Sequence, residues 1–591
     1  MLTYLNVSRP PGGRGASQTN DGLNAGNTLR DLVKSSERSG LPPLPVSTCH
    51  ATADADRARE HLGHHPATAA AAELLSFSTS TLRSSLLSQL VIPGVKMPPP
   101  VPTERRMSAV GSHSNPERFL GQDYHQLHRD FYDNRARFLD STFLPDERAI
   151  GPGLLSDQEM ARVEWIRPTR LVRDPHLVVD GESRFDFAQG ELGNCWFLSA
   201  IGAITFQTDI MDQIIPAGQS FQKEYAGIFH FRFWRFGRWI DVVIDDKLPT
   251  IDGQLIFVHC RTRNEFWPAL LEKAYAKVCG SYADLNGGFV SEALTDFTGG
   301  VHMTLTPREG HPELWGLMYR AAQYRSIMGC GTPQGATPAN TELPNGIVEG
   351  HAYTVTGVTK VKTENGESVK LLRLLNPWGH REWKGDWSDN SPLWRMVSTE
   401  QRTRLLDSKN DGEFWMSMDD FCRSFANVDI CCYTPAFLDG SPPNSWTTAR
   451  YEGCWDERTA GGSMDHKQSF WTNPQYRVKI PAIEPNAGEP QGPNMLLSLM
   501  QKPDNRHRRL AQHLHIGFSV FAIPPEMKDQ TVFPASFFTA NALVAQSRGS
   551  STTREVTEYY RIRPGRYLIV PFTYKPNETT SFVLTVHSKR E

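Results

Sequence analysis

The 591-residue sequence lacks any long hydrophobic run, and its N-terminus lacks the apolar core of a signal peptide. A membrane-spanning helix needs about 18 or more apolar residues in succession, so no transmembrane segment is expected. The nine cysteines are odd in number and include no CxxC pair, which argues against a disulfide framework and favours reduced thiols. These absences together predict a soluble protein of the cytoplasm.

A strong excess of charge is also lacking, because the net charge is only −3 with histidine neutral. This balance predicts no nucleic-acid partner. The basic run Arg506–Arg509 offers at most a weak contact with an anionic membrane surface, and a solvated loop is the simpler interpretation. A chain of this length is expected to carry several domains of roughly 100–200 residues each.

Aromatic residues are almost absent from the first 112 residues, which are rich in Gly, Ser, Pro, Ala and Arg. A segment of this composition cannot bury enough apolar surface to offset the entropy of ordering its backbone. We therefore predict a disordered N-terminal leader over residues 1–112.

The first motif with chemical meaning surrounds Cys195. Gln189 stands six residues before it, glycines at 190 and 193 permit a tight turn, and an apolar run follows as far as Ile204. The run predicts a buried helix that begins at Cys195, where the helix dipole would favour the thiolate, the nucleophilic form of cysteine. An ordinary core cysteine is the alternative.

Two polar residues bracket a predicted β-hairpin further along the chain. His351 precedes the β-prone run 352–357, and Asn376 ends the run 369–375, with the turn signal Asn365-Gly366 between the runs. A hairpin of this kind brings His351 and Asn376 together, provided that a bulge or a longer loop absorbs the unequal arms. Cysteine, histidine and asparagine in this order match the triad of a thiol protease.

Local patterns predict several other elements. Apolar residues recur at helical spacing over 123–144, and a helix after Glu265 would carry Pro268 in its first turn and Gly280 at its end. Alternation around Gly237 predicts a hairpin. Four β-prone runs predict a sandwich near the C-terminus, namely 496–499, 516–521, 567–571 and 582–586.

These segments resemble the calpain family of cysteine proteases, and the likeness extends from about residue 115 to the C-terminus. Other motifs that carry it are Tyr225–Phe231, Glu265–Lys277, Asp411–Met416, Thr459–Gly462 and Phe470–Tyr476. The resemblance implies an α+β fold in which a two-lobed, papain-like protease core precedes a C2-like β-sandwich. The expected divisions are a leader at 1–112, a first lobe at 113–290, a second lobe at 291–435 and the sandwich at 436–591.

The resemblance also implies a role for each residue of the site. Cys195 would be the nucleophile, His351 its base, and Asn376 the residue that orients the imidazole. Gln189 and the backbone N–H of Cys195 would form the oxyanion hole. Trp378 would shield the His–Asn hydrogen bond and hold the cleft open in the resting state.

Calcium is implied by the resemblance alone, because the sequence has no dense D-x-D-x-D-G run. Each lobe of a calpain core holds one calcium ion, and the matching positions here retain the oxygen ligands that calcium prefers. They are Asp186 and Glu265 with the backbone carbonyls of Val179 and Gly181 in the first lobe, and Glu382, Asp389 and Asp411, with Glu413 nearby, in the second. A solvated surface charge is the simpler interpretation of any one of these acids.

Arg184 beside the first set and Glu413 beside the second match residues that pair between the lobes of calpains once calcium is bound. We expect them to form an ion pair that couples the two sites to closure of the cleft. Two independent surface charges are the alternative.

The sequence departs from conventional calpains at three places. Asn194 replaces an aspartate, which is expected to change little, and the loop 483–494 holds only two acidic residues, Glu484 and Glu489. No EF-hand loop follows the predicted sandwich. The third departure implies an atypical calpain that works as a monomer without the conventional small subunit.

The function implied is that of a calcium-dependent intracellular cysteine endopeptidase that makes limited cuts in protein substrates. One alternative is a catalytically silent, calpain-like interaction protein, which the intact Cys195, His351 and Asn376 disfavour. Another is a Cys–His acyltransferase such as a transglutaminase, which would orient its histidine with an aspartate rather than with Asn376.

Overall fold

The computed structural model describes residues 110–307, 313–482, 492–548 and 552–590. Nearly all of the predicted leader, and most of the weakly acidic loop at 483–494, lie outside these ranges. No helix within them is long and apolar enough to cross a membrane.

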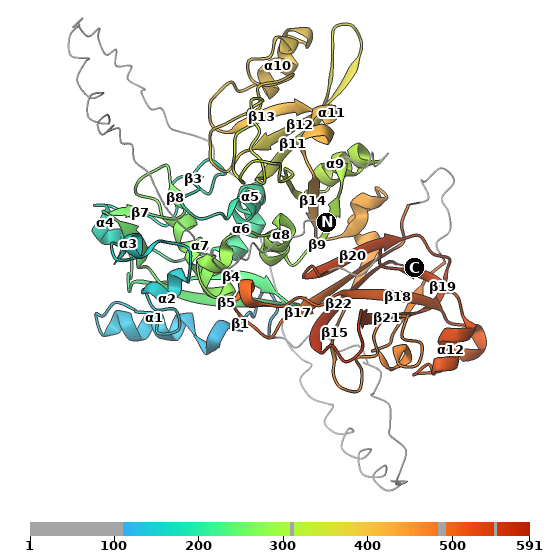
Figure 1. Cartoon of the computed structure of the whole chain (residues 1–591). Coiled ribbons are helices and arrows are strands. Elements are labelled where there is room, and N and C mark those ends of the chain that lie inside the picture. Colours follow the sequence, from blue (N-terminus) through green and yellow to red (C-terminus); the bar gives the residue numbers. More distant parts are fainter. Residues whose placement is uncertain (1–109, 308–312, 483–491, 549–551, 591) are drawn as a thin grey trace, which may run out of the picture. The chain divides into compact units, whose positions relative to one another are not determined.

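The first part of the described chain packs helices against short sheets, with β1–β5–β4, β2–β6–β7 and β3–β8 as the strand orders (Figure 1). Its strands are β1 (Glu117–Arg118), β2 (Glu164–Ile166), β3 (Phe187–Ala188), β4 (Ile228–Arg235), β5 (Arg238–Asp245), β6 (Leu248–Ile251), β7 (Gln254–Leu255) and β8 (His259–Cys260). Its helices are α1 (Tyr124–Asp133), α2 (Glu147–Ile150), α3 (Asp157–Met160), α4 (Pro168–Leu171), α5 (Cys195–Ile204), α6 (Thr208–Ile214), α7 (Trp267–Cys279) and α8 (Val290–Thr298).

Two of the predicted elements in this part are confirmed. Helix α7 has Pro268 in its first turn and ends at Gly280, whose φ of 117° requires a residue without a side chain. Strands β4 and β5 form the predicted hairpin around Gly237, which has a φ of 92°. Helix α7 and the inward faces of this hairpin supply much of the largest apolar core.

The helix expected over 123–144 is wrong for its second half. Helix α1 ends at Asp133, and Arg135 has a left-handed φ of 51°. Beyond it the chain has no regular secondary structure as far as Asp140, and the buried Phe138 donates its backbone N–H to the carbonyl of Ala226. The apolar residues of this second half therefore pack along the edge of the core without forming a helix. There Asp140 pairs with Lys277 of α7.

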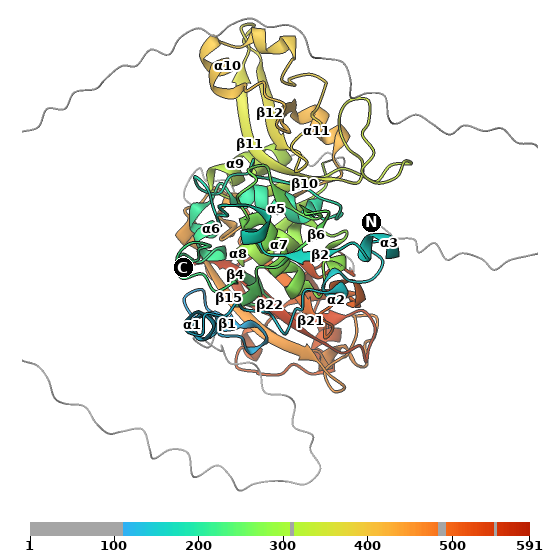
Figure 2. The ribbon, with the colours of Figure 1, turned by 90° about the vertical axis from the view of Figure 1, so that its left-hand side faces the viewer.

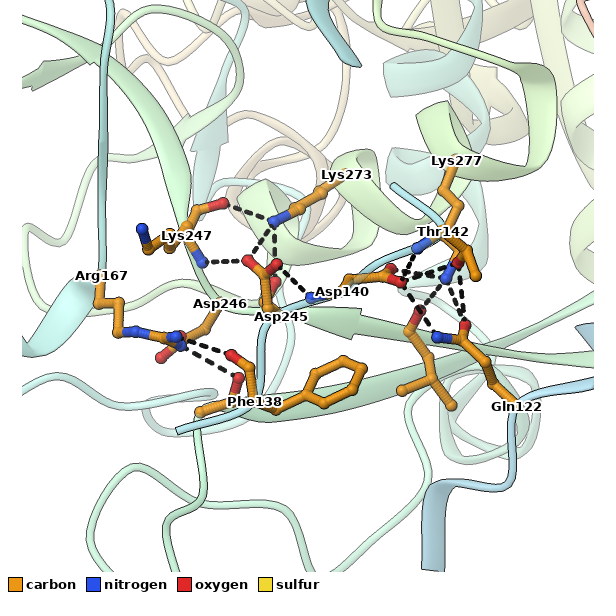
Figure 3. Close-up of polar contacts among 12 residues, drawn as sticks. Gln122, Phe138, Asp140, Thr142, Arg167, Asp245, Asp246, Lys247, Lys273 and Lys277 are labelled. Atoms are coloured by element: carbon orange, nitrogen blue, oxygen red, sulfur yellow. Dashed lines mark hydrogen bonds and ion pairs between the residues drawn. The ribbon is translucent and has the colours of Figure 1, made fainter. Parts of the chain in front are cut away.

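Two buried ion pairs connect α7 to the chain around it (Figure 3). Lys273 and Lys277 lie one turn apart, and both side chains are fully buried. Lys273 Nζ lies 2.7 Å from Asp245 Oδ1, and Lys277 Nζ lies 2.6 Å from Asp140 Oδ2. The backbone N–H of Asp140 donates to Asp245 Oδ2 at 2.9 Å, so the two pairs form one network.

A second lobe is built on a six-stranded antiparallel sheet with the order β13–β12–β11–β10–β14–β9. Its strands are β9 (Val301–Leu305), β10 (Ile327–Gly331), β11 (Ala352–Lys362), β12 (Ser368–Leu375), β13 (Glu413–Ser417) and β14 (Asn427–Cys432), and its helices are α9 (Leu314–Gln323), α10 (Thr399–Leu405) and α11 (Met418–Ser424). The predicted hairpin is β11–β12, and a bulge between Val355 and Gly357 absorbs its unequal arms, as expected.

The C-terminal part holds two four-stranded sheets, with the orders β15–β22–β17–β20 and β16–β21–β18–β19. The four predicted strands are confirmed as β17 (Met495–Lys502), β18 (Ile516–Ala522), β21 (Gly565–Thr573) and β22 (Thr580–Lys589). The patterns did not predict β15 (Trp446–Trp455), β16 (Tyr476–Ile480), β19 (Leu543–Gln546), β20 (Glu555–Tyr560) or α12 (Ala535–Ala540). The four predicted strands are mostly buried, whereas most residues of β15, β19 and β20 are half-buried or exposed, which weakens the apolar signal.

Candidate active site

Helix α5 begins at Cys195, as the sequence predicts, and every residue after Cys195 in the helix is buried. The chain before it passes close to another backbone segment, because a Cβ added at Gly190 would lie 2.4 Å from the carbonyl oxygen of Phe257. Cys195 itself is half-buried. It therefore stands at the N-terminus of a helix whose position the core fixes.

His351 and Asn376 meet across the base of the β11–β12 hairpin. His351 Nε2 lies 2.9 Å from Asn376 Oδ1, and both side chains are buried. Asn376 Nδ2 donates to the carbonyl of Arg381 at 3.1 Å, which directs Oδ1 toward the imidazole. An amide oxygen only accepts, so Nε2 carries the proton and Nδ1 is left as the basic nitrogen.

His351 Nδ1 has no hydrogen-bond partner among the described residues, although it is buried. The thiolate form of Cys195 would be stabilised by the backbone N–H of Ala352, the residue that follows His351. The thiol and the imidazole are therefore neighbours but are not hydrogen-bonded to each other in this conformation.

Reciprocal hydrogen bonds join α5 to β11 just beyond these two residues. Ser199 Oγ donates to the carbonyl of Tyr353 at 2.7 Å, and Thr354 Oγ1 donates to the carbonyl of Ser199 at 2.8 Å. A Cβ added at Gly202 would lie 2.7 Å from Thr354 Oγ1, so the close approach requires glycine there. Helix α5 lies against the base of β11 in both views (Figure 1 and Figure 2). This joint holds Cys195 beside His351.

Trp378 and Gln189 complete the site from opposite lobes. The Trp378 ring lies 4.6 Å from that of His351 between centroids, and its Nε1 donates to Gln189 Oε1 at 2.9 Å. Gln189 Nε2 donates to the carbonyl of Leu192 at 2.6 Å. The structure thus brings all five predicted catalytic positions together.

Burial determines the protonation of the pair in this conformation. It lowers the pKa of His351 to about 4, although the hydrogen bond to Asn376 acts in the opposite direction. Burial also raises the pKa of the Cys195 thiol. In this conformation burial therefore opposes the thiolate form that the start of a helix favours.

Sequence patterns did not point to the buried carboxyl group behind the nucleophile. Asn194 Nδ2 donates to Glu272 Oε1 at 2.6 Å, and the backbone N–H of Val258 donates to Glu272 Oε2 at 3.1 Å. Burial raises the pKa of Glu272 to about 8. Asn194 Oδ1 is buried without a partner among the described residues. Asn194 thus has a role in positioning the residue that follows it, Cys195.

Glu272→Gln is expected to reduce the pH dependence of stability. The native state holds the Glu272 proton up to about pH 8, whereas an unfolded chain releases it near the ordinary value of 4.5. Between these limits the native state binds more protons, so the free energy of unfolding falls as pH rises. Glutamine is neutral throughout, so the variant should melt several degrees above the wild type at pH 8–9. Thermal unfolding from pH 5 to 9 tests this, and parallel curves for the two proteins would contradict it.

The predicted metal ligands of the first lobe lie near one another. Glu265 Oε1 accepts the backbone N–H of Val179 at 2.9 Å, and Asp186 accepts the N–H of Ser183. Burial raises the pKa of Glu265 to about 7, and the charge of Asp186 adds to this effect. Gly181 has a φ of 89°, in the turn that follows Val179.

The acids of the second lobe also repel one another. Burial raises the pKa of Asp389 to about 7, with further contributions from Glu382 and Asp411. Asp389 Oδ2 is buried and has no hydrogen-bond partner among the described residues. Glu382 Oε1 accepts the backbone N–H of Gly412 at 2.8 Å. Over the described ranges no three His, Cys, Asp or Glu side chains lie close enough together to form a metal site. The fit to calcium therefore rests on the preference of calcium for oxygen ligands and on the carboxylate oxygen of Asp389 that has no partner.

Glu413 lies beside these acids, since its charge also acts on Asp389, and its carboxylate pairs with a cation of the other lobe. Arg184 Nε and Nη2 donate to Glu413 Oε1 and Oε2 at 2.8 and 2.9 Å. Both side chains are partly buried and keep some contact with solvent, with exposures of 21% and 11%. Arg373 Nε lies 3.4 Å from Glu413 Oε2. The predicted pairing of Arg184 with Glu413 is confirmed.

A cysteine at the start of a buried helix, beside a His–Asn pair from a second lobe, gives the molecule the architecture of a papain-like cysteine protease. Residues 138–432 match the family model described as "Calpain family cysteine protease", and residues 451–587 match "Calpain large subunit, domain III". The chain belongs to the calpain family.

Individual relatives agree with this assignment. The Calpain-1 catalytic subunit of Sus scrofa is 42% identical over 492 residues, which cover 82% of this chain and 69% of that protein. The Calpain-2 catalytic subunit of Homo sapiens is 38% identical over 490 residues, covering 82% and 70%. A solved structure of the cysteine protease and lectin-like domains of Cwp84 from Clostridium difficile has a TM-score of only 0.18 at 10% identity, over 84% of this chain and 86% of that one.

Proposed function

We propose that the protein is a calcium-dependent intracellular cysteine endopeptidase that makes limited cuts in protein substrates. The observation that carries the proposal is the His351–Asn376 hydrogen bond, which leaves Nδ1 basic beside Cys195. Burying these polar side chains costs free energy, and a silent interaction protein would not need them for its function.

The chemistry is that of acyl transfer through a thiol. His351 Nδ1 takes the thiol proton as Cys195 Sγ attacks the substrate carbonyl carbon and forms an S–C bond. The backbone N–H of Cys195 and the second Nε2 hydrogen of Gln189 stabilise the negative oxygen, a contribution on the order of 3 kcal/mol for one donor. The C–N bond then breaks, and the amine leaves with the proton from His351. Water, deprotonated by His351, hydrolyses the thioester and restores the thiol.

Calcium would be held by Asp186, Glu265 and the carbonyls of Val179 and Gly181 in one lobe, and by Glu382, Asp389 and Asp411 in the other. The ion would supply positive charge that relieves the mutual repulsion of these acids. Our proposal gives Glu413 a different role from that of a ligand, since it already pairs with Arg184. Ordering of either calcium site would then favour the Arg184–Glu413 ion pair, and the pair would favour closure of the two lobes.

Arg184→Ala is expected to raise the calcium concentration for half-maximal activity, or to lower activity at saturating calcium, with little change in the thermal midpoint. An ion pair that keeps some contact with solvent contributes only about 0–1 kcal/mol, yet a bias of ~1.4 kcal/mol changes an open–closed ratio tenfold. The swap of Arg184→Glu with Glu413→Arg should restore part of the loss. Restoration is incomplete because Arg373 would then face a second arginine in place of Glu413.

Arg162→Ala is the matched control, because Arg162 pairs with Asp252 on the exposed surface of one lobe. It should leave the calcium response unchanged. If the double swap is only the sum of its single changes, Arg184 and Glu413 do not couple the lobes.

Digestion of casein with and without calcium tests the proposed activity. The wild type should produce discrete fragments in calcium and none in excess chelator, and Cys195→Ala should produce none in either. Equal digestion in chelator would remove calcium from the proposal, and no digestion under any condition would favour the silent alternative.

Cytoplasmic location, a monomeric state and the domain divisions at 290 and 435 remain predictions.

A further inference from the structure

A cavity of about 330 Å³ opens where the loop after β17 meets the first lobe. Its lining includes only three carboxylates, Glu117, Glu292 and Asp504, against a larger number of cations. The cationic side chains are those of Arg235, Arg238, Lys502, Arg506, Arg508 and Arg554. The wall therefore carries an excess of positive charge in a protein whose net charge is −3.

Three arginines at the cavity pair with only two carboxylates among the described residues. Arg235 and Arg554 share Asp296, and Arg508 Nε lies 2.9 Å from Glu292 Oε2. Arg554 is only 5% exposed, and its Nε has no hydrogen-bond partner among the described residues. A buried guanidinium nitrogen without an acceptor is costly and calls for an explanation.

The rim adds two cations, Lys502 and Arg506, to the single carboxylate of Asp504 on the same loop. Lys502 and Arg506 are exposed and form no ion pair within the described ranges. Arg238, by contrast, already pairs with Glu452 and Glu117. An anion entering the cavity would meet two free cations first and the buried arginines beyond them.

The interpretation of 506–509 as a solvated loop is wrong for Arg508. Its guanidinium lies 4.7 Å from the ring centroid of Trp196, the residue after Cys195, and Nη1 donates to the carbonyl of Gly287 at 2.7 Å. Backbone carbonyls and an aromatic face replace water around this side chain. The loop is therefore held against the first lobe, which gives the cavity a fixed wall.

We propose that this cavity is a binding site for a small anion that carries two or more phosphate groups. Guanidinium groups match phosphate oxygens in pairs, and several of them converge here. The volume lies at the lower end of the range for small-molecule pockets, which suits a compact phosphate ester. Phe119 and Phe236 also line the cavity and can accept the less polar body of such a molecule.

Titration calorimetry of the full chain with inositol trisphosphate and with pyrophosphate tests the site, and unphosphorylated inositol is the blank. Both phosphate probes should bind, and inositol should not. Lys502→Gln and Arg506→Gln should each weaken binding by about tenfold, the effect of losing a charged hydrogen bond. Neither side chain has an ion pair to lose among the described residues, so the thermal midpoints without ligand should stay unchanged.

Arg509→Gln is the matched control, because it removes the same charge from the same loop at a residue that does not line the cavity. It should change affinity by less than about twofold. No binding of either phosphate probe to the wild type would overturn the proposal, and so would equal weakening by Arg509→Gln, which would indicate diffuse attraction.

Sedimentation with phosphatidylcholine vesicles, with and without phosphatidylinositol bisphosphate, distinguishes the source of the phosphate. Binding that requires the phosphoinositide and is lost in the Lys502→Gln, Arg506→Gln double variant identifies a lipid headgroup as ligand. Binding of the soluble probes without vesicle binding identifies a free phosphate ester. Vesicle binding that survives in the double variant, without soluble binding, places phosphate recognition elsewhere and contradicts the site.

Discussion

His351→Ala is expected to reduce peptide-bond hydrolysis at least about a thousandfold. The imidazole is the sole base beside the thiol in the proposed mechanism, and burial raises the pKa of Cys195, so the thiol does not ionise by itself at neutral pH. Loss of the base removes the proton transfer from the thiol, the transfer to the leaving amine and the deprotonation of the hydrolytic water. Initial rates on casein at saturating calcium measure the effect.

The control for this variant is His125→Ala, which changes an exposed histidine of α1 in the first lobe. It should retain the rate of the wild type. Thermal unfolding must show that His351→Ala is folded, since the change leaves a small cavity beside Tyr353. Retention of more than a few per cent of the rate by a folded His351→Ala protein would show that another base acts.

Lys277→Met is expected to destabilise the first lobe by about 3–5 kcal/mol, because it leaves Asp140 buried without its cation. Lys277 Nζ also donates to Gln122 Oε1 and to the carbonyl of Val243, so three acceptors lose their donor together (Figure 3). Burial alone would raise the pKa of Asp140, yet Lys277 holds it below its ordinary value. At roughly 2–4 °C per kcal/mol, the thermal midpoint should fall by on the order of 10 °C.

Adding Asp140→Leu to Lys277→Met should recover much of the loss, since an apolar pair does not carry the cost of an unpaired charge. Lys223→Met is the control in the same lobe, because that lysine is exposed. It should change the free energy of unfolding by less than about 0.5 kcal/mol. A Lys277→Met protein as stable as Lys223→Met would mean that the buried network does not hold the lobe together.

The features that the sequence predicted correctly have local signals. The start of α5 follows from a glycine turn and an apolar run, and the bulge at Val355 follows from unequal arms around Asn365-Gly366. The pairing of Arg184 with Glu413 came from the family resemblance, because nothing local links residues so far apart.

The features that were missed depend on distant partners. Glu272 and Lys277 look like solvent-facing charges of an amphipathic helix until the fold supplies Asn194 and Asp140. Similarly, Arg508 looks like part of a solvated basic loop until Glu292 and the Gly287 carbonyl are placed beside it. The effect of burial on the pKa of Cys195 was missed for a different reason, since an argument from the helix dipole omits the desolvation that only the packed site reveals.

Labelling by an epoxysuccinyl peptide, read by mass spectrometry of the intact chain and its fragments, tests the central claim most directly. The claim is that Cys195 is the nucleophile and that His351 activates it. In calcium the wild type should gain one label, on Cys195, with loss of casein hydrolysis in proportion, and His351→Ala should remain unlabelled over the same time. A label on another cysteine, or full hydrolysis by a protein whose Cys195 is labelled, would contradict the claim.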